Sequence, residues 1–370
     1  MKILVIYATA GAGHRKAAEA VYNGLKETGN APITLADSLD YTSPFYKFMY
    51  SGTYTFLISK IPWAWGFIFA LIDFRFLRGF INSMRRIQNF LNGRPLVRFL
   101  EREQFDCIVS THFFSNEVAS HLKRKGKINS KIISVITDFD VHSIWLADGI
   151  DKYTVATPWT KEKLRILGVS EDRIAVTGIP TDAKFSNEAR PRDISELKRK
   201  LGLRENVLTA LVATGSFGIG PIEDIVDAVL RTGGENNIQI MVVCGHNQNL
   251  YTRLKAKEKG LVKIFGLVNN MHELMAVSDV MVTKPGGLSI AEALVSGLPM
   301  IFFNAIPGQE ENNIKALKQS GVGMSGYSIP QIAEALKKFS FSKSDLQAAK
   351  EKAKALGKPS AVKDIISLIK

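Results

Sequence analysis

The chain alternates short runs of apolar and β-branched residues with stretches in which apolar residues recur every three or four positions. The short runs predict strands buried in a sheet, and the periodic stretches predict helices that cover it. This order is typical of parallel sheets with helices on both faces. In the first half, strands are predicted at residues 3–7, 33–37, 107–111, 132–137, 153–156 and 174–177.

The same pattern starts again at Val207, after a polar and charged stretch that includes Pro191. Strands are predicted there at residues 207–213, 238–244, 262–265, 280–283 and 300–303. Each half opens with a strand, a glycine-rich turn and a helix, so we expect an α/β protein with two Rossmann-like domains and an interdomain cleft. The predicted divisions are an N-terminal domain over 1–190, a C-terminal domain over 191–345, and a C-terminal helix over 346–370 that can pack back on the N-terminal domain.

Composition narrows the class of protein. Hydrophobic residues make up 46% of the chain and charged residues 22%, which excludes a disordered or low-complexity protein. Cys107 and Cys244 are too few for a disulfide framework and indicate a reducing compartment. No apolar run reaches the roughly 18 residues of a membrane-spanning helix. Met1 and Lys2 lead directly into a predicted strand, so we expect no signal peptide.

The net charge of +13 is concentrated in one region. Residues 41–100 hold 16 of the 34 aromatic side chains and eight Lys or Arg, with Asp73 as the one acidic residue. Apolar and aromatic groups interleaved with arginine favour a segment that lies in the interface of an anionic membrane. Two alternatives remain: a core helical pair with a solvated basic face, and stacking on nucleic acid, for which no recognised motif is present. The candidate membrane residues are Trp63, Trp65, Phe67, Arg75 and Arg78.

The first glycine-rich turn places Gly11 and Gly13 between a strand and a helix, with His14 next in the chain. Glycines let the backbone approach a ligand, and a helix N-terminus favours negative charge. The same positive potential should lower the pKa of His14 and keep it neutral, as a general base requires. Alternatively, His14 only caps the turn.

Two turns of the second half suit a phosphate. Gly215 and Ser216 follow the first strand there, and Gly286 and Gly287 follow a later strand and lead at once into a helix. Glu292 lies one turn into that helix, where an acid can accept hydrogen bonds from a ribose diol. The alternative is a pair of packing turns with Glu292 in solvent.

Three further groups follow predicted strands. Gln309, Glu310 and Glu311 suit a ligand with many hydroxyl groups. Asp138 and Asp140 could hold a divalent metal, but the spacing offers no third ligand. His142 and Trp145 are as easily core residues as ligands.

Taken together and in order, these motifs resemble one family. The chain is similar to the monogalactosyldiacylglycerol synthase and processive diacylglycerol glucosyltransferase branch of the family 28 glycosyltransferases, and more distantly to the lipid-linked N-acetylglucosamine transferase of peptidoglycan synthesis. The likeness runs from residue 1 to about residue 325. The motifs that carry it are Gly11-Ala12-Gly13-His14-Arg15, Thr137-Asp138 with His142 and Trp145, Thr177-Gly178-Ile179-Pro180, Lys284-Pro285-Gly286-Gly287-Leu288 and Pro307-Gly308-Gln309-Glu310.

The resemblance implies a GT-B fold, with the acceptor on the N-terminal, membrane-associating domain and a UDP-sugar on the C-terminal domain. It implies inverting transfer of galactose or glucose to diacylglycerol or a related lipid, giving a β-glycolipid, with no cofactor and no essential metal. That removes the metal interpretation of Asp138 and Asp140. It also implies a cytoplasmic enzyme, peripheral on the inner face of the cell membrane, with no nucleic-acid partner. The alternatives are transfer of N-acetylglucosamine to a polyprenyl-linked lipid, and epimerisation of a UDP-sugar.

Residue by residue, the resemblance makes His14 the general base that takes the proton of the acceptor hydroxyl, and Asp138 a group that positions His14 or the acceptor. The implied donor-binding residues are Gly215, Ser216, Leu267, Val268, Met271, Gly286, Gly287, Leu288, Ser289, Glu292, Gln309, Glu310 and Glu311. The implied acceptor-binding residues are Gly11, Gly13, His142 and Trp145.

Overall fold

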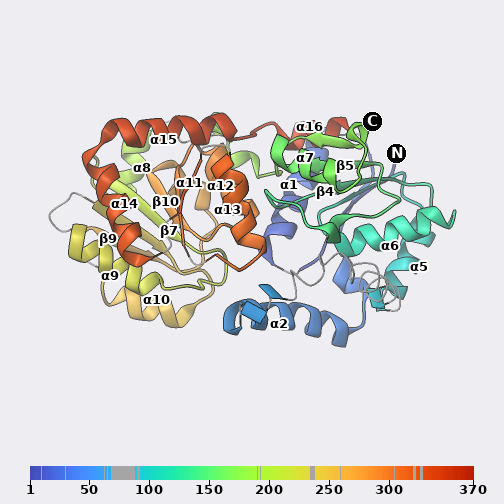
Figure 1. Ribbon diagram of the computed structural model, residues 1–370, viewed down its shortest axis with the longest axis horizontal. Helices are drawn as coiled ribbons and strands as arrows, with labels where there is room; N and C mark the ends of the chain where they lie inside the picture. The colour runs from blue at the N-terminus through green and yellow to red at the C-terminus, as the bar shows by residue number, and fades with distance from the viewer. Residues whose placement is uncertain are drawn as a thin grey trace. The chain divides into compact units, whose positions relative to one another are not determined.

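The structure is a computed structural model of the 370-residue chain (Figure 1). It describes all residues except 10, 30, 62, 65, 68–87, 90, 91, 190, 192, 234–237, 259, 304, 320, 321, 326 and 327. Three of the candidate membrane residues, Trp65, Arg75 and Arg78, lie outside the described residues.

The chain divides into two compact units. The first unit comprises Met1–Asp182, Ile306–Ala316 and Ser360–Lys370, and the second comprises Ala183–Ala305 and Leu317–Pro359. The chain leaves the first unit before residue 190, the predicted boundary. The reason is that the short 3-10 helix η4 (Ala183–Phe185) packs on α12 (Gly287–Val295) of the second unit, where Ser296 Oγ donates to the Phe185 carbonyl at 3.4 Å.

The first unit is built on a six-stranded parallel sheet in the order β2-β1-β3-β4-β5-β6. All six strands predicted for this half are present, with small differences at their ends. They are β1 (Ile3–Tyr7), β2 (Ile33–Asp37), β3 (Cys107–Ser110), β4 (Lys131–Val135), β5 (Lys152–Val155) and β6 (Ile174–Val176). The α-helices are α1 (Ala12–Glu27), α2 (Pro44–Lys60), α5 (Arg94–Glu103), α6 (Phe113–Arg124), α7 (Pro158–Ile166), the first part of α13 (Gln309–Gln319) and α16 (Ala361–Ser367).

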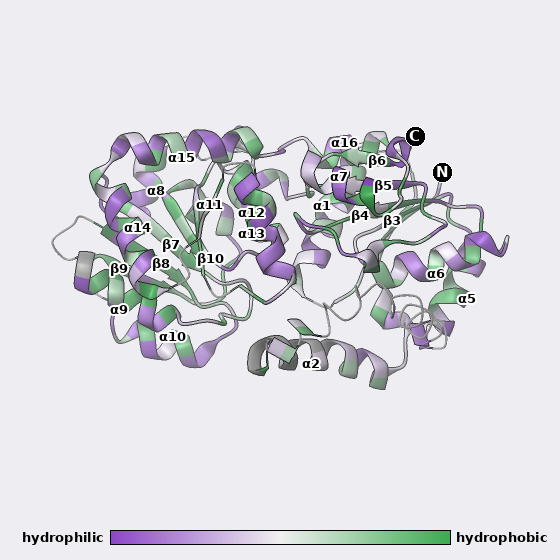
Figure 2. Ribbon diagram, in the orientation of Figure 1, coloured by the Kyte–Doolittle hydropathy of each residue, from purple (hydrophilic) through white to green (hydrophobic). Residues whose placement is uncertain are grey.

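Alternate residues of β1 enter cores on opposite faces of this sheet, as the two-residue period of a strand requires. Leu4 and Ile6 join one core, while Ile3 and Val5 join the other together with the buried Ile365 of the C-terminal helix α16. In Figure 2 the strands are coloured largely as hydrophobic, whereas the helices carry both hydrophobic and hydrophilic residues.

The end of the chain differs from the single helix predicted over 346–370. Two helices are present, and they belong to different units: α15 (Lys343–Leu356) packs on α12 in the second unit, and α16 packs on α1 in the first. Gly357 is the C-cap of α15, and a side chain at that position would come within 2.5 Å of the Leu294 carbonyl oxygen.

The second unit contains another six-stranded parallel sheet, in the order β12-β11-β10-β7-β8-β9. Five of these strands were predicted, and β12, only two residues long, was missed. The strands are β7 (Leu208–Ala213), β8 (Ile238–Val243), β9 (Val262–Phe265), β10 (Val280–Thr283), β11 (Met300–Phe302) and β12 (Met324–Ser325). The α-helices are α8 (Ile194–Lys200), α9 (Ile222–Gly233), α10 (Gln248–Lys255), α11 (Met271–Ala276), α12, the end of α13, α14 (Ile329–Phe341) and α15.

Each sheet reverses its strand order beside its first strand. β1 lies between β2 and β3, and β7 lies between β8 and β10. In open parallel sheets, ligands bind beyond the carboxyl ends of the strands at such a reversal. The loops after β1 and β3, and those after β7 and β10, are therefore the places where a site is expected.

Candidate active site

In the first unit, the loops after β1, β3 and β4 bring three polar groups together. Gly11 precedes α1 with a φ of 151°, a backbone conformation that favours glycine. His14 follows in the first turn of α1. Its Nδ1 lies 2.8 Å from the carbonyl oxygen of Thr111 and 2.9 Å from the hydroxyl of Thr137.

These contacts determine which ring nitrogen of neutral His14 carries the hydrogen. A carbonyl oxygen can only accept a hydrogen bond, so Nδ1 of His14 must be the protonated nitrogen that donates to Thr111. Nε2 then keeps its lone pair. Thr111 also fixes the backbone at this point, because its hydroxyl donates to the His14 carbonyl at 2.9 Å.

The surroundings of His14 favour the neutral ring. Burial lowers the pKa of His14, while the negative charge of Asp138 and the hydrogen bond to Thr111 act in the opposite direction with a smaller effect. The ring of His112 packs edge-on against His14 at a centroid distance of 4.8 Å, and the ring of Trp145 lies 6.2 Å away. The lowered pKa therefore favours the neutral imidazole, whose lone pair lies on Nε2 because Nδ1 donates to Thr111.

Asp138, in the loop after β4, is held by two amide side chains of α13. Gln309 Nε2 donates to one carboxylate oxygen and Asn313 Nδ2 to the other, each at 3.1 Å. Burial raises the pKa of Asp138, and the two amide donors together with His14 oppose that rise. The charges of His14 and Asp138, the predicted catalytic pair, thus act on each other: Asp138 raises the pKa of His14, and His14 lowers that of Asp138.

The predicted donor residues on α13 lie in the first unit. Gln309 contacts Asp138, as described above. Glu310 accepts from the Ile306 backbone N–H at 2.7 Å, and Glu311 accepts from that of Gly308 at 3.2 Å, so both carboxylates bond to the chain that enters α13. Sequence reasoning missed the contact between α13 and Asp138, since no spacing in the sequence indicates it.

The two predicted acceptor residues after Asp138 are buried. His142 is 7% exposed, and its Nδ1 accepts from the Ile144 N–H at 3.1 Å, which caps the short 3-10 helix η2 (Ser143–Trp145). Trp145 is 4% exposed and belongs to the core of the first unit, beside His14. Trp145 therefore lies beside His14, whereas His142 caps η2, and the contact of either side chain with an acceptor stays a prediction.

In the second unit, the predicted donor residues follow β7, β9 and β10. Gly215 turns the chain after β7 with a φ of +72°, and α12 begins at Gly287 directly after β10. Since β7 and β10 are neighbours, the Gly215 turn and the first turn of α12 leave the sheet side by side. The remaining predicted residues are Ser216 beside Gly215, Leu267, Val268 and Met271 after β9, and Gly286, Leu288, Ser289 and Glu292 at the start of α12.

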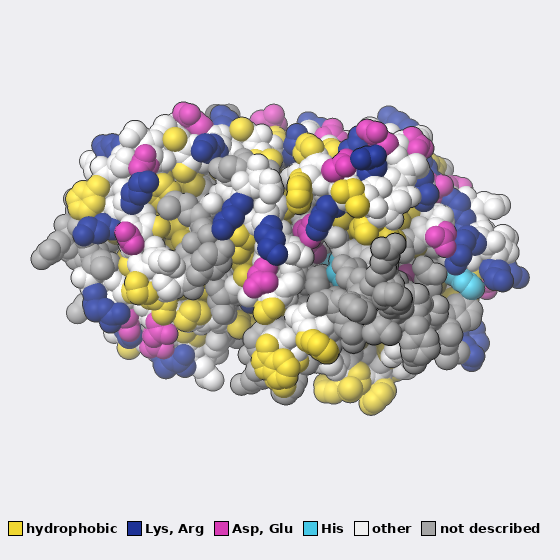
Figure 3. Space-filling view, in the orientation of Figure 1, with side chains coloured by type: hydrophobic (Ala, Val, Ile, Leu, Met, Phe, Trp, Pro, Cys, Tyr) yellow, Lys and Arg dark blue, Asp and Glu magenta, His cyan; other side chains and the backbone are white. Residues whose placement is uncertain are grey.

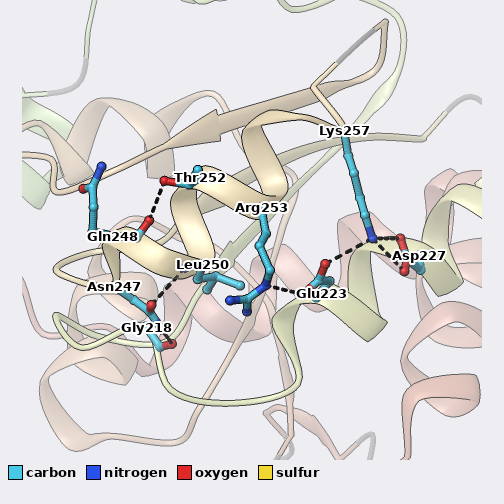
Figure 4. A network of polar contacts seen from close by, with 9 residues as sticks. All are labelled: Gly218, Glu223, Asp227, Asn247, Gln248, Leu250, Thr252, Arg253 and Lys257. Atoms are coloured by element: carbon cyan, nitrogen blue, oxygen red, sulfur yellow. Dashed lines mark hydrogen bonds and ion pairs between the residues drawn. The ribbon is translucent and has the colours of Figure 1, made fainter.

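Asn247, which sequence reasoning missed, holds the Gly215 turn in place (Figure 4). Its Nδ2 donates to the Gly218 carbonyl at 3.0 Å, and its Oδ1 accepts from the Leu250 N–H at 3.0 Å, so it also caps α10. The Gly215 turn lies close to the turn that follows β8, because a side chain on Gly218 would come within 2.2 Å of the Cys244 carbonyl oxygen. An asparagine just before a helix after a buried strand was the available signal.

Figure 4 also shows ion pairs between α9 and the chain around α10, including one between Lys257 and Glu223 at 3.4 Å. Arg253 pairs with Glu223 at 3.1 Å, and Lys257 pairs with Asp227 at 2.9 Å. Such exposed pairs contribute little to stability. The polar contacts that matter for the turn are those of Asn247.

Comparison with known proteins gives matches along most of the chain. Residues 14–181 match the family model for monogalactosyldiacylglycerol (MGDG) synthase, and residues 209–367 match the model for the glycosyltransferase family 28 C-terminal domain. The processive diacylglycerol beta-glucosyltransferase of Staphylococcus carnosus is 31% identical over 344 residues, which cover 87% of this chain and 80% of that protein. The Bacillus subtilis protein of the same name is 27% identical over 336 residues, covering 87% and 82%.

Solved structures share the fold at low sequence identity. UDP-GlcNAc 2-epimerase from Neisseria meningitidis, bound to UDP-GlcNAc, superposes with a TM-score of 0.63 at 13% identity, covering 99% of both chains. Acinetobacter baumannii MurG gives a TM-score of 0.61 at 14% identity, covering 100% of this chain and 99% of that one. This chain therefore shares its fold, with two Rossmann-like domains, with these solved structures.

Proposed function

Because this chain belongs to the family 28 glycosyltransferases, in the branch of the MGDG synthases and the processive diacylglycerol glucosyltransferases, we propose that it transfers a hexose from a UDP-sugar to diacylglycerol or a related lipid. The hexose is glucose or galactose. Its curated relatives are named as glucosyltransferases, which favours glucose.

The observation that carries this proposal is the hydrogen bond from His14 Nδ1 to the Thr111 carbonyl. It leaves the Nε2 lone pair as the acceptor of a proton. Nε2 removes the proton of the lipid hydroxyl while that oxygen attacks the anomeric carbon of the sugar. The bond between the anomeric carbon and the diphosphate oxygen breaks, and UDP leaves with its electron pair. Attack opposite to the leaving group inverts the anomeric centre and gives a β-glycoside.

Each unit supplies a different part of this chemistry. In the first unit, the carboxylate of Asp138 stabilises the imidazolium that forms when His14 takes the proton. In the second unit, the backbone N–H groups of the Gly215 turn and of the first turn of α12 receive the negative charge of the leaving diphosphate, with Glu292 on the ribose. We expect no metal or other cofactor to be essential.

We further propose that the first unit lies on an anionic membrane surface, at the cytoplasmic face of the cell membrane. On α2, Phe45 and Phe48 are 74% and 73% exposed and Met49 is 44% exposed. Their spacing of three and four residues puts them on one face of the helix. Trp63 and Phe67 are 72% and 66% exposed as well. Figure 3 shows hydrophobic side chains gathered along α2.

The exposed fractions of these five side chains argue against the alternative interpretation, in which this region forms a helical pair in the core. In the described part of the chain, no helix combines the length and the apolar character that crossing a bilayer demands. Separately, the exposed apolar face of α2 is typical of a helix that lies in a membrane interface.

Vesicle binding tests the membrane proposal. Replacing Phe45 and Phe48 with serine should weaken sedimentation with phosphatidylglycerol vesicles by about tenfold or more, because two exposed aromatic side chains no longer enter the interface. Phe341→Ser is the matched control, since Phe341 is 69% exposed on α14 of the second unit and should leave vesicle binding unchanged. Equal vesicle binding by the double variant and the wild type would refute the role of α2.

A donor and acceptor screen tests the activity. The protein is incubated with radiolabelled UDP-glucose, UDP-galactose or UDP-N-acetylglucosamine and vesicles that contain diacylglycerol or a polyprenyl phosphate lipid. We expect label in a diacylglycerol glycolipid, most of it from UDP-glucose. Label only in the polyprenyl lipid, or conversion of the UDP-sugar without any lipid, would replace the proposal with one of the two alternatives.

A further inference from the structure

Asn313 lies on α13 one helical turn after Gln309 and is completely buried. Its Oδ1 accepts from the backbone N–H groups of Phe139 at 2.8 Å and Asp140 at 3.2 Å. Its Nδ2 donates to Asp138 Oδ1 at 3.1 Å. The amide has one orientation that fits, because the reverse would turn its N–H₂ group toward two N–H donors and its oxygen toward a carboxylate.

Three independent contacts fix the short loop from Thr137 to Asp140. Asn313 binds two of its backbone N–H groups, and the hydroxyl of Thr160 donates to the Phe139 carbonyl at 2.6 Å. Lys163 pairs with the buried carboxylate of Asp140 at 2.6 Å. Among these, Asn313 alone also bonds to the carboxylate of Asp138, and together with Gln309 it occupies both oxygens of that group.

We propose that Asn313 is a positioning residue for sugar transfer, which acts by fixing the Asp138 carboxylate in the orientation that supports His14. This inference rests on the proposed function. We call the contacts of Asn313 with Asp138, Phe139 and Asp140 the clamp. The segment Ile306–Ala316 belongs to the first unit, so the clamp and the groups that it holds form one compact body. A displaced catalytic group reduces turnover more than it reduces substrate binding.

Charges around the clamp make its effect measurable. The negative charge of Asp138 raises the pKa of His14, whereas burial lowers it. The negative charge of Asp140, which is paired with Lys163, raises the pKa of Asp138. When Asn313 no longer holds Asp138, the carboxylate is free to turn toward water. The pKa of His14 should then fall, whereas a purely structural contact would leave it unchanged.

The test compares Asn313→Ala with Asn312→Ala, its neighbour on the same helix, whose side chain accepts at 3.4 Å from Lys315. For Asn313→Ala we expect kcat to fall by about 10- to 100-fold, with KM for the UDP-sugar within about threefold of the wild type. Asn312→Ala should behave as the wild type. A kcat for Asn313→Ala within twofold of the wild type would overturn the proposal.

Asn313→Asp covers the case in which the alanine variant does not fold. It keeps the shape and the acceptor for Phe139 and Asp140, and replaces only the donor that faces Asp138. We expect a folded protein with kcat reduced by at least tenfold. The acid limb of kcat/KM should move to lower pH, because a second carboxylate makes Asp138 harder to ionise and a protonated Asp138 no longer raises the pKa of His14. A folded Asn313→Asp variant with the wild-type rate and pH profile would overturn the proposal.

A readout independent of turnover separates this inference from the proposed function. The protein has six histidines, so His14 can be assigned in ¹³C-histidine-labelled protein by comparison with a His14→Gln variant and titrated by NMR. A lower His14 pKa in Asn313→Ala supports the clamp even if the wild type forms no glycolipid, an outcome that contradicts only the proposed function. An active wild type and an unmoved His14 titration would contradict only the clamp.

Discussion

The two units share one plan but carry different chemistry at the same edge of the sheet. Each has six parallel strands, a reversal of strand order beside its first strand, and a glycine-containing turn after that strand. In the first unit this edge collects titratable side chains, with the half-buried His14 and Asp138 at its centre. In the second unit it offers backbone turns at Gly215 and at the start of α12.

The difference follows from what each half of the reaction needs. Proton transfer depends on side chains whose pKa is set by burial and neighbouring charge. Binding of a diphosphate depends on N–H groups in fixed positions, which a glycine turn and a helix N-terminus provide without ionisable groups. Under the proposed function one scaffold serves both purposes, so substitutions in the two units should affect different kinetic constants.

The largest effect is expected from His14→Ala. Loss of the general base should lower kcat by about 10²- to 10⁴-fold, because the acceptor hydroxyl then keeps its proton. The affinity for UDP, measured by calorimetry, should stay within twofold of the wild type. His121→Ala, which removes an imidazole from α6, is the control and should leave the rate unchanged. Near-normal turnover of His14→Ala would exclude its role as base.

A large effect on stability should follow from Ile365→Ala. This side chain of α16 is fully buried in the core beneath α1, so its truncation should lower the free energy of unfolding of the first unit by about 2–4 kcal/mol. Lys363→Ala, on the exposed face of the same helix, should leave it unchanged. Equal denaturation midpoints for the two variants would show that α16 does not stabilise this core.

Gly218→Ala should weaken donor binding in the second unit. Its φ of +57° is unfavourable for alanine, and the new methyl group would come within 2.2 Å of the Cys244 carbonyl oxygen. The Gly215 turn must then shift, and we expect the Kd for UDP to rise about tenfold. Gly260→Ala separates strain from the clash, because Gly260 has a φ of +53° and nothing within 4 Å of the added carbon. Equal Kd values for both variants would refute the explanation by clash.

The smallest effect is the pH dependence of the wild type. Burial lowers the pKa of His14 below its ordinary value of about 6.5, so the neutral base is present at pH 7 and is lost only in more acidic solution. Values of kcat/KM measured from pH 5 to 9 should be level near neutrality and fall on an acid limb whose midpoint lies below 6.5. A midpoint above 7 would contradict a His14 that is neutral at pH 7.

The sequence predicts the architecture well because strands and glycine turns are local features. Eleven of the twelve strands in the described part of the chain follow from apolar runs such as Ile3 to Tyr7, whereas β12 has only two residues and gives no periodic signal. His14 and the start of α12 were found for the same reason: each stands directly after a strand.

Contacts between residues far apart in the chain could not be predicted in this way. Asn313 reaches Asp138 across 175 positions, and Asn247 holds a turn 29 residues earlier in the chain. Neither partner follows from periodicity or spacing. The first contact depends on where α13 packs in its unit, and the second depends on where α10 packs in its own. The same limit explains why Gln309 was assigned to the donor without its contact to Asp138.

The most direct test of the division between the units measures kcat for transfer to diacylglycerol and Kd for UDP on His14→Ala and Gly218→Ala side by side. The account predicts opposite patterns: His14→Ala loses turnover and keeps UDP affinity, whereas Gly218→Ala loses UDP affinity and keeps most of its turnover at saturating donor. If both variants lose the same constant, or if His14→Ala still forms glycolipid at the wild-type rate, the assignment of proton transfer to the first unit and diphosphate binding to the second is wrong.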